Sequence, residues 1–527
     1  MAAEFDARIF FRSSALESDT FRVVDFEGVE EISRPFRFEI NVVAEDPEID
    51  LKAVCNEPAV LELERDGEVR SIHGVLAQFE QRDWGPNLHF YRAVLVPRLW
   101  LLSLRRQNQV FSSDPGDLTG WSSGLKIEDI LEQVLKEAGF STDDYEFDLQ
   151  ETHPYREYVV QYQETDLDFI SRLMEHEGIF YYFSHEDGKD KLIIADKNER
   201  FEAIAGQSEL IFRPPTGMVN VEREAVHKLM CKQSRIPKEL MLKDYNWRTP
   251  SLNLTVKETI DDESEGMVCE YGNHFKDTDK EGATLARIRA EEIRSTQTRF
   301  CGEGNGIGFQ AGYLYELAEH YRPEFDQEYL IVSVRHSGSQ ASAGVSATEN
   351  QKPSYRNEFT AITSKTAFRP ARITPKPRIV GAINAKVDAA PGRRFAEMDE
   401  YGRYRVALTL DQGVDVAGLP GGTRSRWVRM AQPFSGRDMG MCFPLHPGTE
   451  VLLTHVDGDP DRPIIAGSVP NVETRGPVED ENHMKNVIRS GGSNWIELDD
   501  APGQEGIMMT SKKMGATRVM RARPRKA

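Results

Sequence analysis

Alternating apolar and polar residues dominate the first hundred positions of the chain. The pattern is clear in residues 21–27 (FRVVDFE), in 36–42 (FRFEINV) and in 60–64 (VLELE), which ends at the turn Arg65-Asp-Gly-Glu68. A period of two residues with turn residues between the runs is typical of antiparallel strands that are buried on one face. We therefore predict a β barrel over about residues 5–110.

A helical period follows and predicts an insert of helices and a hairpin over about residues 120–200. Apolar residues in 126–138 recur at i, i+3, i+4 and i+7, and Gly139 lies where a left-handed cap belongs. A second helix begins at Thr165, with Asp168 three residues later as in a capping box, and ends at Gly178. The apolar runs 179–183 and 191–195 then flank a turn and predict a β-hairpin.

The next 165 residues return to strands and predict a second β barrel over about residues 201–365. One helix is expected within it, from Lys280 to Ser295. Residues 338–354 (GSQASAGVSATENQKPS) are small and polar, which indicates an exposed loop. The prolines around 371–378 predict an extended linker, because proline fixes φ and lacks an amide donor.

The C-terminal part has its own pattern. Residues 379–470 contain about five short strands, a number that fits a small barrel of the OB type. Residues 471–510 begin as a polar joint and then resume strand alternation in 494–500 and 507–510. The fold class we predict is mainly β, with an α+β portion made of two barrel-like domains and a helical insert, followed by the OB-fold barrel and a stub of strands.

The charge of the chain is strongly acidic but unevenly placed. The 527 residues carry 65 Lys and Arg against 86 Asp and Glu, a formal charge of −21. This balance argues against nucleic acid as a partner and against binding to an anionic membrane surface. The tail 511–527 is basic and holds no acidic residue. Its seven basic residues are candidates for docking an acidic partner, and a frayed, solvated end is the alternative interpretation. They are Lys512, Lys513, Arg518, Arg521, Arg523, Arg525 and Lys526.

Neither a membrane helix nor a secretory signal is expected from the sequence. No run reaches 18 apolar residues, and the N-terminal MAAEFDARIF has acids where a basic leader region would stand. The five cysteines are scattered and form no CxxC, so we expect reduced thiols of a product made in the cytoplasm.

Motifs for catalysis or cofactor binding are weak throughout, and we expect no catalytic residue, cofactor or metal site. The Glu175-His-Glu177 and His185-Glu-Asp187 stretches carry metal-type ligands, but no HExxH occurs, so we interpret them as a solvated helix face and hairpin tip. Residues 306–311 satisfy GxGxxA, yet the following 312–317 alternate like a strand, which favours glycines at strand bends. The aromatic run 180–183 indicates a strand packed on both faces more than a carbohydrate platform.

Several stretches closely resemble the VgrG family, the spike proteins of type VI secretion systems. They are residues 161–183, 329–336, 368–370, 374–377, 448–453, 458–467 and 492–500. The resemblance extends from about residue 7 to about residue 510. It implies a phage-hub-like region over 1–370, an OB domain over 379–470, and the start of a trimeric β-helix after about residue 485. It also implies a non-enzymatic, homotrimeric spike that is exported by a contractile machine, punctures a target envelope and carries effectors.

The partners implied by this resemblance are a hexameric Hcp-like tube, baseplate components, and a PAAR-like tip protein or an effector or adaptor at the C-terminal end. A membrane enters only as a target. Two departures stand out: about 27 residues follow Asp500, where family members usually continue, and 111–125 resembles an insertion. Two alternatives stay open, a phage or prophage tail hub-spike and a cell-wall hydrolase with paired carboxylates.

Overall fold

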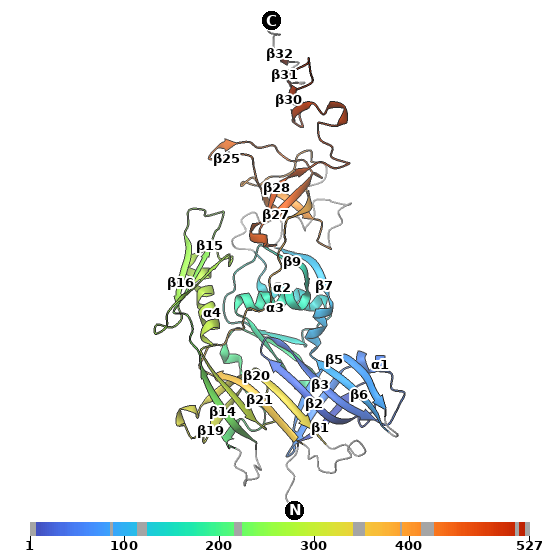
Figure 1. The fold of residues 1–527 in the computed structure, drawn as a ribbon, viewed down its shortest axis with the longest axis vertical. Coiled ribbons are helices and arrows are strands. Elements are labelled where there is room, and N and C mark those ends of the chain that lie inside the picture. Colours follow the sequence, from blue (N-terminus) through green and yellow to red (C-terminus); the bar gives the residue numbers. More distant parts are fainter. Residues whose placement is uncertain are drawn as a thin grey trace, which may run out of the picture. The chain divides into compact units, whose positions relative to one another are not determined.

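The computed structural model describes residues 7–84, 88–112, 124–214, 224–340, 354–389, 393–412, 426–511 and 516–521. The chain divides into two compact units. The first comprises residues 1–106, 126–154 and 164–376, and the second comprises 107–125, 155–163 and 377–527. Figure 1 shows both units and labels many of their elements. No helix in the described ranges is long and apolar enough to span a membrane.

A sheet of 13 strands forms most of the first unit, in the order β1-β4-β5-β6-β3-β2-β20-β21-β18-β14-β13-β19-β12. Its first half comprises β1 (Arg8–Ser13), β2 (Arg22–Glu31), β3 (Arg34–Ala44), β4 (Ala59–Arg65), β5 (Glu68–Trp84) and β6 (His89–Val96). Its second half comprises β12 (Glu202–Ala203), β13 (Glu209–Phe212), β14 (Ala225–Gln233), β18 (Thr298–Gly304), β19 (Tyr313–Ala318), β20 (Glu328–Ser339) and β21 (Ser354–Thr363).

The second half of this sheet closes on itself, because β19 also pairs with β20. Aromatic side chains fill the resulting ring, among them Phe300, Phe309, Tyr315, Tyr329 and Phe359. Antiparallel pairing of β2 with β20 joins the two halves. Barrel-like β structure predicted from the alternation is therefore confirmed.

The predicted helices and hairpin are also present. They are α2 (Ile127–Glu137), α3 (Asp166–Glu177), α4 (Ala283–Arg294), β10 (Phe180–Ser184) and β11 (Lys191–Ala195), with β8 (Tyr145–Asp148) parallel to β11. Thr165 caps α3 by accepting from the Asp168 N–H at 3.0 Å, and Gly178 ends it at φ 73°. All four aromatic residues of β10 are buried, which confirms a strand packed on both faces.

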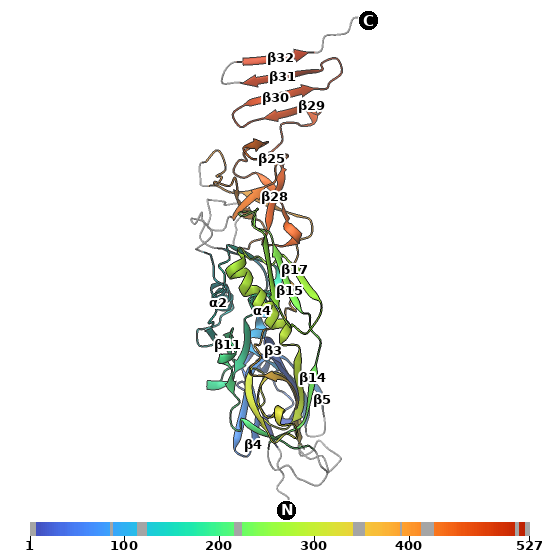
Figure 2. The same cartoon turned by 90° about the vertical axis from the view of Figure 1, so that its left-hand side faces the viewer.

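A separate three-stranded sheet packs on α4, as both views show (Figures 1 and 2). It consists of β15 (Glu239–Asp244), β16 (Leu254–Thr259) and β17 (Met267–Tyr271), in the order β16-β15-β17. The remaining helical elements are α1 (Leu51–Asn56), the 3-10 segments Arg98–Leu104, Glu186–Gly188, Asn198–Arg200, Pro323–Phe325, Val456–Gly458 and Asp480–Asn482, and the π turn Thr278–Gly282.

Two loop regions of the first unit bear on the sequence analysis. The prediction of an exposed loop over 338–354 is wrong at both ends, because Ser339 in β20 pairs with Ser354 in β21. The small residue Gly338 is needed there, since a Cβ would lie 2.4 Å from the Phe26 ring. Residues 341–353 lie outside the described part of the chain. The GxGxxA run lies between β18 and β19, so a strand follows it and the dinucleotide interpretation was rightly set aside.

The second unit is built around a closed barrel of five strands, as expected for the OB type. They are β22 (Ala382–Val387), β23 (Tyr404–Leu408), β24 (Arg426–Met430), β27 (Glu450–His455) and β28 (Pro463–Val469), in the order β22-β23-β24-β28-β27. The paired strands β7 (Arg106–Ser112) and β9 (Tyr158–Thr165) contribute Val110 and Tyr158 to its apolar core. A hairpin of β25 (Ser435–Gly436) and β26 (Met439–Gly440) leaves the barrel between β24 and β27.

The chain ends in a four-stranded antiparallel meander, which is drawn as a flat ladder of strands in Figure 2. Its strands are β29 (Lys485–Arg489), β30 (Asn494–Asp499), β31 (Gly506–Ser511) and β32 (Ala516–Arg521). Gly503 has φ 82° in the turn predicted between the last two alternating runs. We call this meander the terminal sheet.

Candidate functional site: a buried strap and an uncovered sheet

Residues 368–376 follow β21 and begin with Phe368-Arg-Pro370, and we call them the strap. The sequence predicted an extended linker in this region. The strap contains no helix or strand, as a linker would, but it is fixed to the first unit. The Phe368 N–H donates to Asn198 Oδ1 at 2.9 Å, and the Asn198 amide donates to the Thr366 carbonyl at 2.7 Å.

Arg369 of the strap is buried, with a side chain that is 3% exposed. Its Nη2 lies 2.7 Å from Glu151 Oε1 and its Nε lies 2.8 Å from Glu291 Oε2. Its Nη1 donates to the carbonyls of Gly178 at 3.0 Å and Asp196 at 2.7 Å. One guanidinium therefore joins the end of α3, the helix α4 and two loop segments.

Two further strap residues are held by carboxylates. Arg372 bonds Glu270 of β17 at 2.7 Å and Glu292 of α4 at 2.9 Å. Thr374 donates to Glu175 of α3 through its N–H at 2.9 Å and its hydroxyl at 2.8 Å. The strap is thus fixed at three points to helices and to one strand.

These contacts correct the interpretation of Glu175-His-Glu177 as a solvated helix face. Glu175 and Glu177 are buried, and Arg34 donates to Glu175 Oε1 at 3.1 Å from both Nη1 and Nη2. The physical reason is that partners distant in sequence satisfy the charges, so the carboxylates tolerate burial. At the hairpin tip Glu186 and Asp187 are exposed, as expected, but His185 is half-buried and its Nδ1 accepts from the His73 N–H at 3.1 Å.

His153 lies buried between two carboxylates of the same region. Its Nε2 is 3.1 Å from Asp196 Oδ2, and its Nδ1 is 3.7 Å from Glu177 Oε2. Burial lowers the pKa of His153, but the hydrogen bonds and charges of Asp196 and Glu177 outweigh it and raise the pKa to about 9. A charged imidazole with both nitrogens facing carboxylates stabilises the fold and is unsuited to metal ligation.

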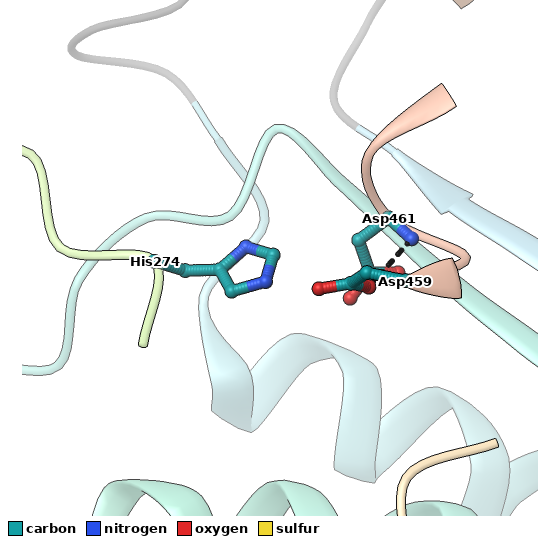
Figure 3. Close-up of side chains that lie close together, drawn as sticks. All are labelled: His274, Asp459 and Asp461. Atoms are coloured by element: carbon teal, nitrogen blue, oxygen red, sulfur yellow. Dashed lines mark hydrogen bonds between the residues drawn. The ribbon is translucent and has the colours of Figure 1, made fainter. Parts of the chain in front are cut away.

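Two aspartates of the second unit form a polar turn after Val456–Gly458. The Asp461 N–H donates to Asp459 Oδ1 at 2.9 Å, drawn as the dashed line in Figure 3, and the Val160 N–H donates to Asp461 Oδ1 at 2.7 Å. Figure 3 also labels His274 of the first unit, whose N–H donates to Asp244 Oδ2. The aspartates thus accept backbone amides, and we assign no metal to them.

The terminal sheet has four paired strands but no core of its own among the described residues. None of the residues from 466 to 511 is buried. The register places Ile488, Ile496 and Met509 opposite one another, and Leu498 opposite Ile507. These five apolar side chains therefore share one face. A sheet with an uncovered apolar face is unstable alone in water.

The predicted docking residues follow directly in the chain. Arg518 and Arg521 lie in β32, where Arg518 is exposed and pairs with Met509 of β31. Lys512, Lys513, Arg523, Arg525 and Lys526 lie outside the described residues. The structure therefore brings two of the seven into one strand.

Sequence reasoning did not single out the carboxylates that hold the strap. Glu151 and Glu291 are 218 and 78 residues away from Arg369. The one signal available was the Phe368-Arg-Pro370 motif itself, which belongs to the resemblance but does not reveal its partners.

Two family models match the chain. The model described as the phage tail baseplate hub matches residues 29–342, more than half of the chain. The model described as the type VI secretion system and phage-baseplate injector OB domain matches residues 399–469, within the closed barrel.

Several spike proteins of Pseudomonas aeruginosa are similar over nearly the whole chain. The type VI secretion system spike protein VgrG1b is 30% identical over 97% of this chain and 68% of its own length. VgrG1a of the same organism is 30% identical over 94% of this chain and 76% of its own length. The actin cross-linking toxin VgrG1 of Vibrio cholerae is 29% identical, and the chain spans 45% of that protein.

Solved structures agree in fold. The E. coli c3393 protein, reported as a type VI secretion component similar to the T4 phage tail proteins gp27 and gp5, has a TM-score of 0.62 and 26% identity. The match covers 87% of this chain and 99% of that one. A Francisella PdpA-VgrG complex has a TM-score of 0.61 at 9% identity, which shows a shared fold. On the family model and these relatives, the chain belongs to the VgrG family of type VI secretion system spike proteins.

Proposed function

We propose that three copies of this chain assemble into the spike of a type VI secretion machine, and that the spike acts mechanically and not as an enzyme. The terminal sheet carries this proposal, because it has regular strands but no buried residue between 466 and 511. Its outer strands β29 and β32 also leave backbone groups without a strand neighbour among the described residues. Three sheets wound into one β-helix would cover the apolar faces and pair these edges.

The strap supports a mechanical role for the same molecule. When a spike is driven through an envelope, force acts on the segment by which the chain leaves the first unit, which here is the strap. Arg369, Arg372 and Thr374 distribute such a force over α3, α4 and β17 through charge-assisted bonds. Because Arg369 is buried, water competes poorly for these bonds.

The proposed partners are those that the family relationship suggests. Residues 1–370 would seat a hexameric Hcp-like tube among baseplate components, and the C-terminal end would bind a PAAR-like tip protein or an effector or adaptor. A relative solved as a PdpA-VgrG complex and a relative named as an actin cross-linking toxin support cargo at a spike of this kind. We further propose that the chain is assembled in the cytoplasm and exported by the machine.

The test of this function is the mass of the purified full chain in solution. At micromolar concentration we expect a mass near three chains, and a monomer would contradict the proposal. Incubation of the same preparation with purified cell wall should release no soluble fragments. Release that is abolished by replacing a single carboxylate would instead support a hydrolase.

A further inference from the structure

The hairpin that leaves the OB barrel between β24 and β27 is exposed and rich in apolar side chains. All twelve residues from Pro433 to Pro444 are exposed. Four large apolar side chains lie on it, with exposed fractions of 54% for Phe434, 64% for Met439, 45% for Met441 and 50% for Phe443. Monomeric proteins seldom expose apolar residues at this density. We therefore expect the hairpin to be covered in an assembly.

The hairpin nevertheless has a defined shape. Ser435 pairs with Gly440, Gly436 pairs with Met439, and the Met441 N–H donates to the Phe434 carbonyl at 3.0 Å. A Cβ at Gly440 would lie 2.7 Å from that carbonyl oxygen, so the two arms can approach this closely only with glycine there. A two-stranded ribbon is at best marginally stable in water. Its regular form therefore calls for a surface to pack on.

Charge indicates what kind of surface that is. The hairpin carries one basic and one acidic residue, Arg437 and Asp438, both at its turn. Its arms are uncharged, so they offer nothing by which an oppositely charged cargo would be recognised. Each copy of the chain carries −21, and like-charged copies approach one another best at uncharged, apolar surfaces. Interfaces between identical copies are also richer in apolar surface than transient ones.

We propose that the hairpin of one copy packs against the second unit of a neighbouring copy and so interlocks the OB barrels of the assembly. This inference rests on the trimer proposed above, but it places a contact outside the terminal sheet. The second unit offers further uncovered apolar residues to receive the hairpin, in the loop before β23: Phe395, Met398 and Tyr401. Each copy then gives one hairpin and receives one, so that a ring of three closes without a free hairpin.

Cys442 provides a direct probe, because this exposed thiol lies within the hairpin itself. The full chain is treated with iodoacetamide at a concentration where its mass is known, and alkylation of each cysteine is followed by peptide mass spectrometry. We expect Cys442 to react at least about tenfold more slowly in the assembly than in urea, because a covered thiol reacts only when the contact opens. Cys269, exposed on β17 of the first unit, is the control and should react at nearly its unfolded rate.

A pair of variants supplies the second measurement. Phe434→Ser together with Phe443→Ser should raise the concentration at which the assembly dissociates by about tenfold or more, as expected for apolar anchors of an interface. Val472→Ser, at a residue 85% exposed on the same unit, is the matched control and should leave assembly unchanged. Because both phenylalanines are half-exposed in the single chain, their replacement should not unfold it.

The outcomes separate the two proposals. The hairpin contact is overturned, and the proposed spike kept, if the wild-type trimer has a Cys442 that reacts as fast as in urea. The same holds if the double variant forms a trimer as stable as the wild type. A wild-type monomer overturns both. A trimer with a protected Cys442 that dissociates in the double variant supports the interlock.

Discussion

Arg369 and Glu151 form an ion pair of 2.7 Å although 218 residues separate them in the sequence. Lys197 and Arg287 contact the same carboxylate, each at 2.5 Å. Burial would raise the pKa of Glu151, but the hydrogen bonds and charges of Lys197, Arg369 and Arg287 outweigh it and lower the pKa to about 2. The carboxylate therefore stays charged at every physiological pH and holds the strap in place.

Replacing Arg369 tests the strap. Arg369→Met keeps an unbranched side chain but leaves Glu291 without its buried partner on the strap, so we expect a loss of about 3 kcal/mol in the free energy of unfolding. Urea unfolding of the full chain measures it. Arg378→Met removes a solvent-exposed pair with Asp457 and is the matched control. Equal effects of the two variants would show that the buried contacts do not hold the strap.

His153 predicts a specific pH dependence. Its pKa in the folded chain is about 9, above the usual histidine value of 6.5. The stability that His153 contributes to the folded chain is therefore complete below pH 6.5 and is lost as the pH rises toward 9. His153→Gln should therefore cost most stability near pH 6 and least near pH 9. Thermal unfolding across this range gives the difference, with His483→Gln, at an exposed histidine, as the control. A cost independent of pH would contradict a charged His153.

Because the apolar face of the terminal sheet is internal in the proposed trimer, we expect one charge on that face to block assembly. In Met509→Asp the carboxylate would be buried among Ile488, Ile496 and their counterparts from other copies, at a cost of several kcal/mol. The native mass should fall from three chains to one. Gln504→Asp adds the same charge in the exposed turn before β31 and should leave the mass unchanged. A trimer in both variants would show that this face is not internal.

The basic end of the chain predicts electrostatic capture of an acidic partner. Changing its seven basic residues to glutamine keeps β32 but removes the charge, and should weaken binding of poly-L-glutamate at least about tenfold at low ionic strength. The native mass should stay near three chains, since the apolar face is unchanged. Unaltered binding at low salt would exclude the tail as a docking site.

Local patterns in the sequence predicted the elements well, because each depends on neighbours within a few residues. The cap of Thr165 on Asp168 and the alternation in β30 and β31 are both local. They sufficed to predict the barrels, the helix-to-hairpin insert and a terminal run of strands.

What the sequence did not reveal depends on contacts between distant segments. The burial of Glu175 requires Arg34 and Thr374, which lie 141 and 199 residues away. The hairpin at Phe434 was missed for a different reason, since its glycines and prolines interrupt any alternation. The strap looked like a free linker because its prolines indicate extension but not attachment.

The central claim is that other copies of the chain cover the terminal sheet, and hydrogen exchange tests it most directly. In a single layer with no buried residue, the amides of 485–511 would exchange nearly as fast as in an unfolded peptide. We predict that at a concentration giving a mass of three chains these amides exchange at least about a thousandfold more slowly, and that Met509→Asp abolishes the protection. Fast exchange of 485–511 in a preparation of that mass would contradict the account.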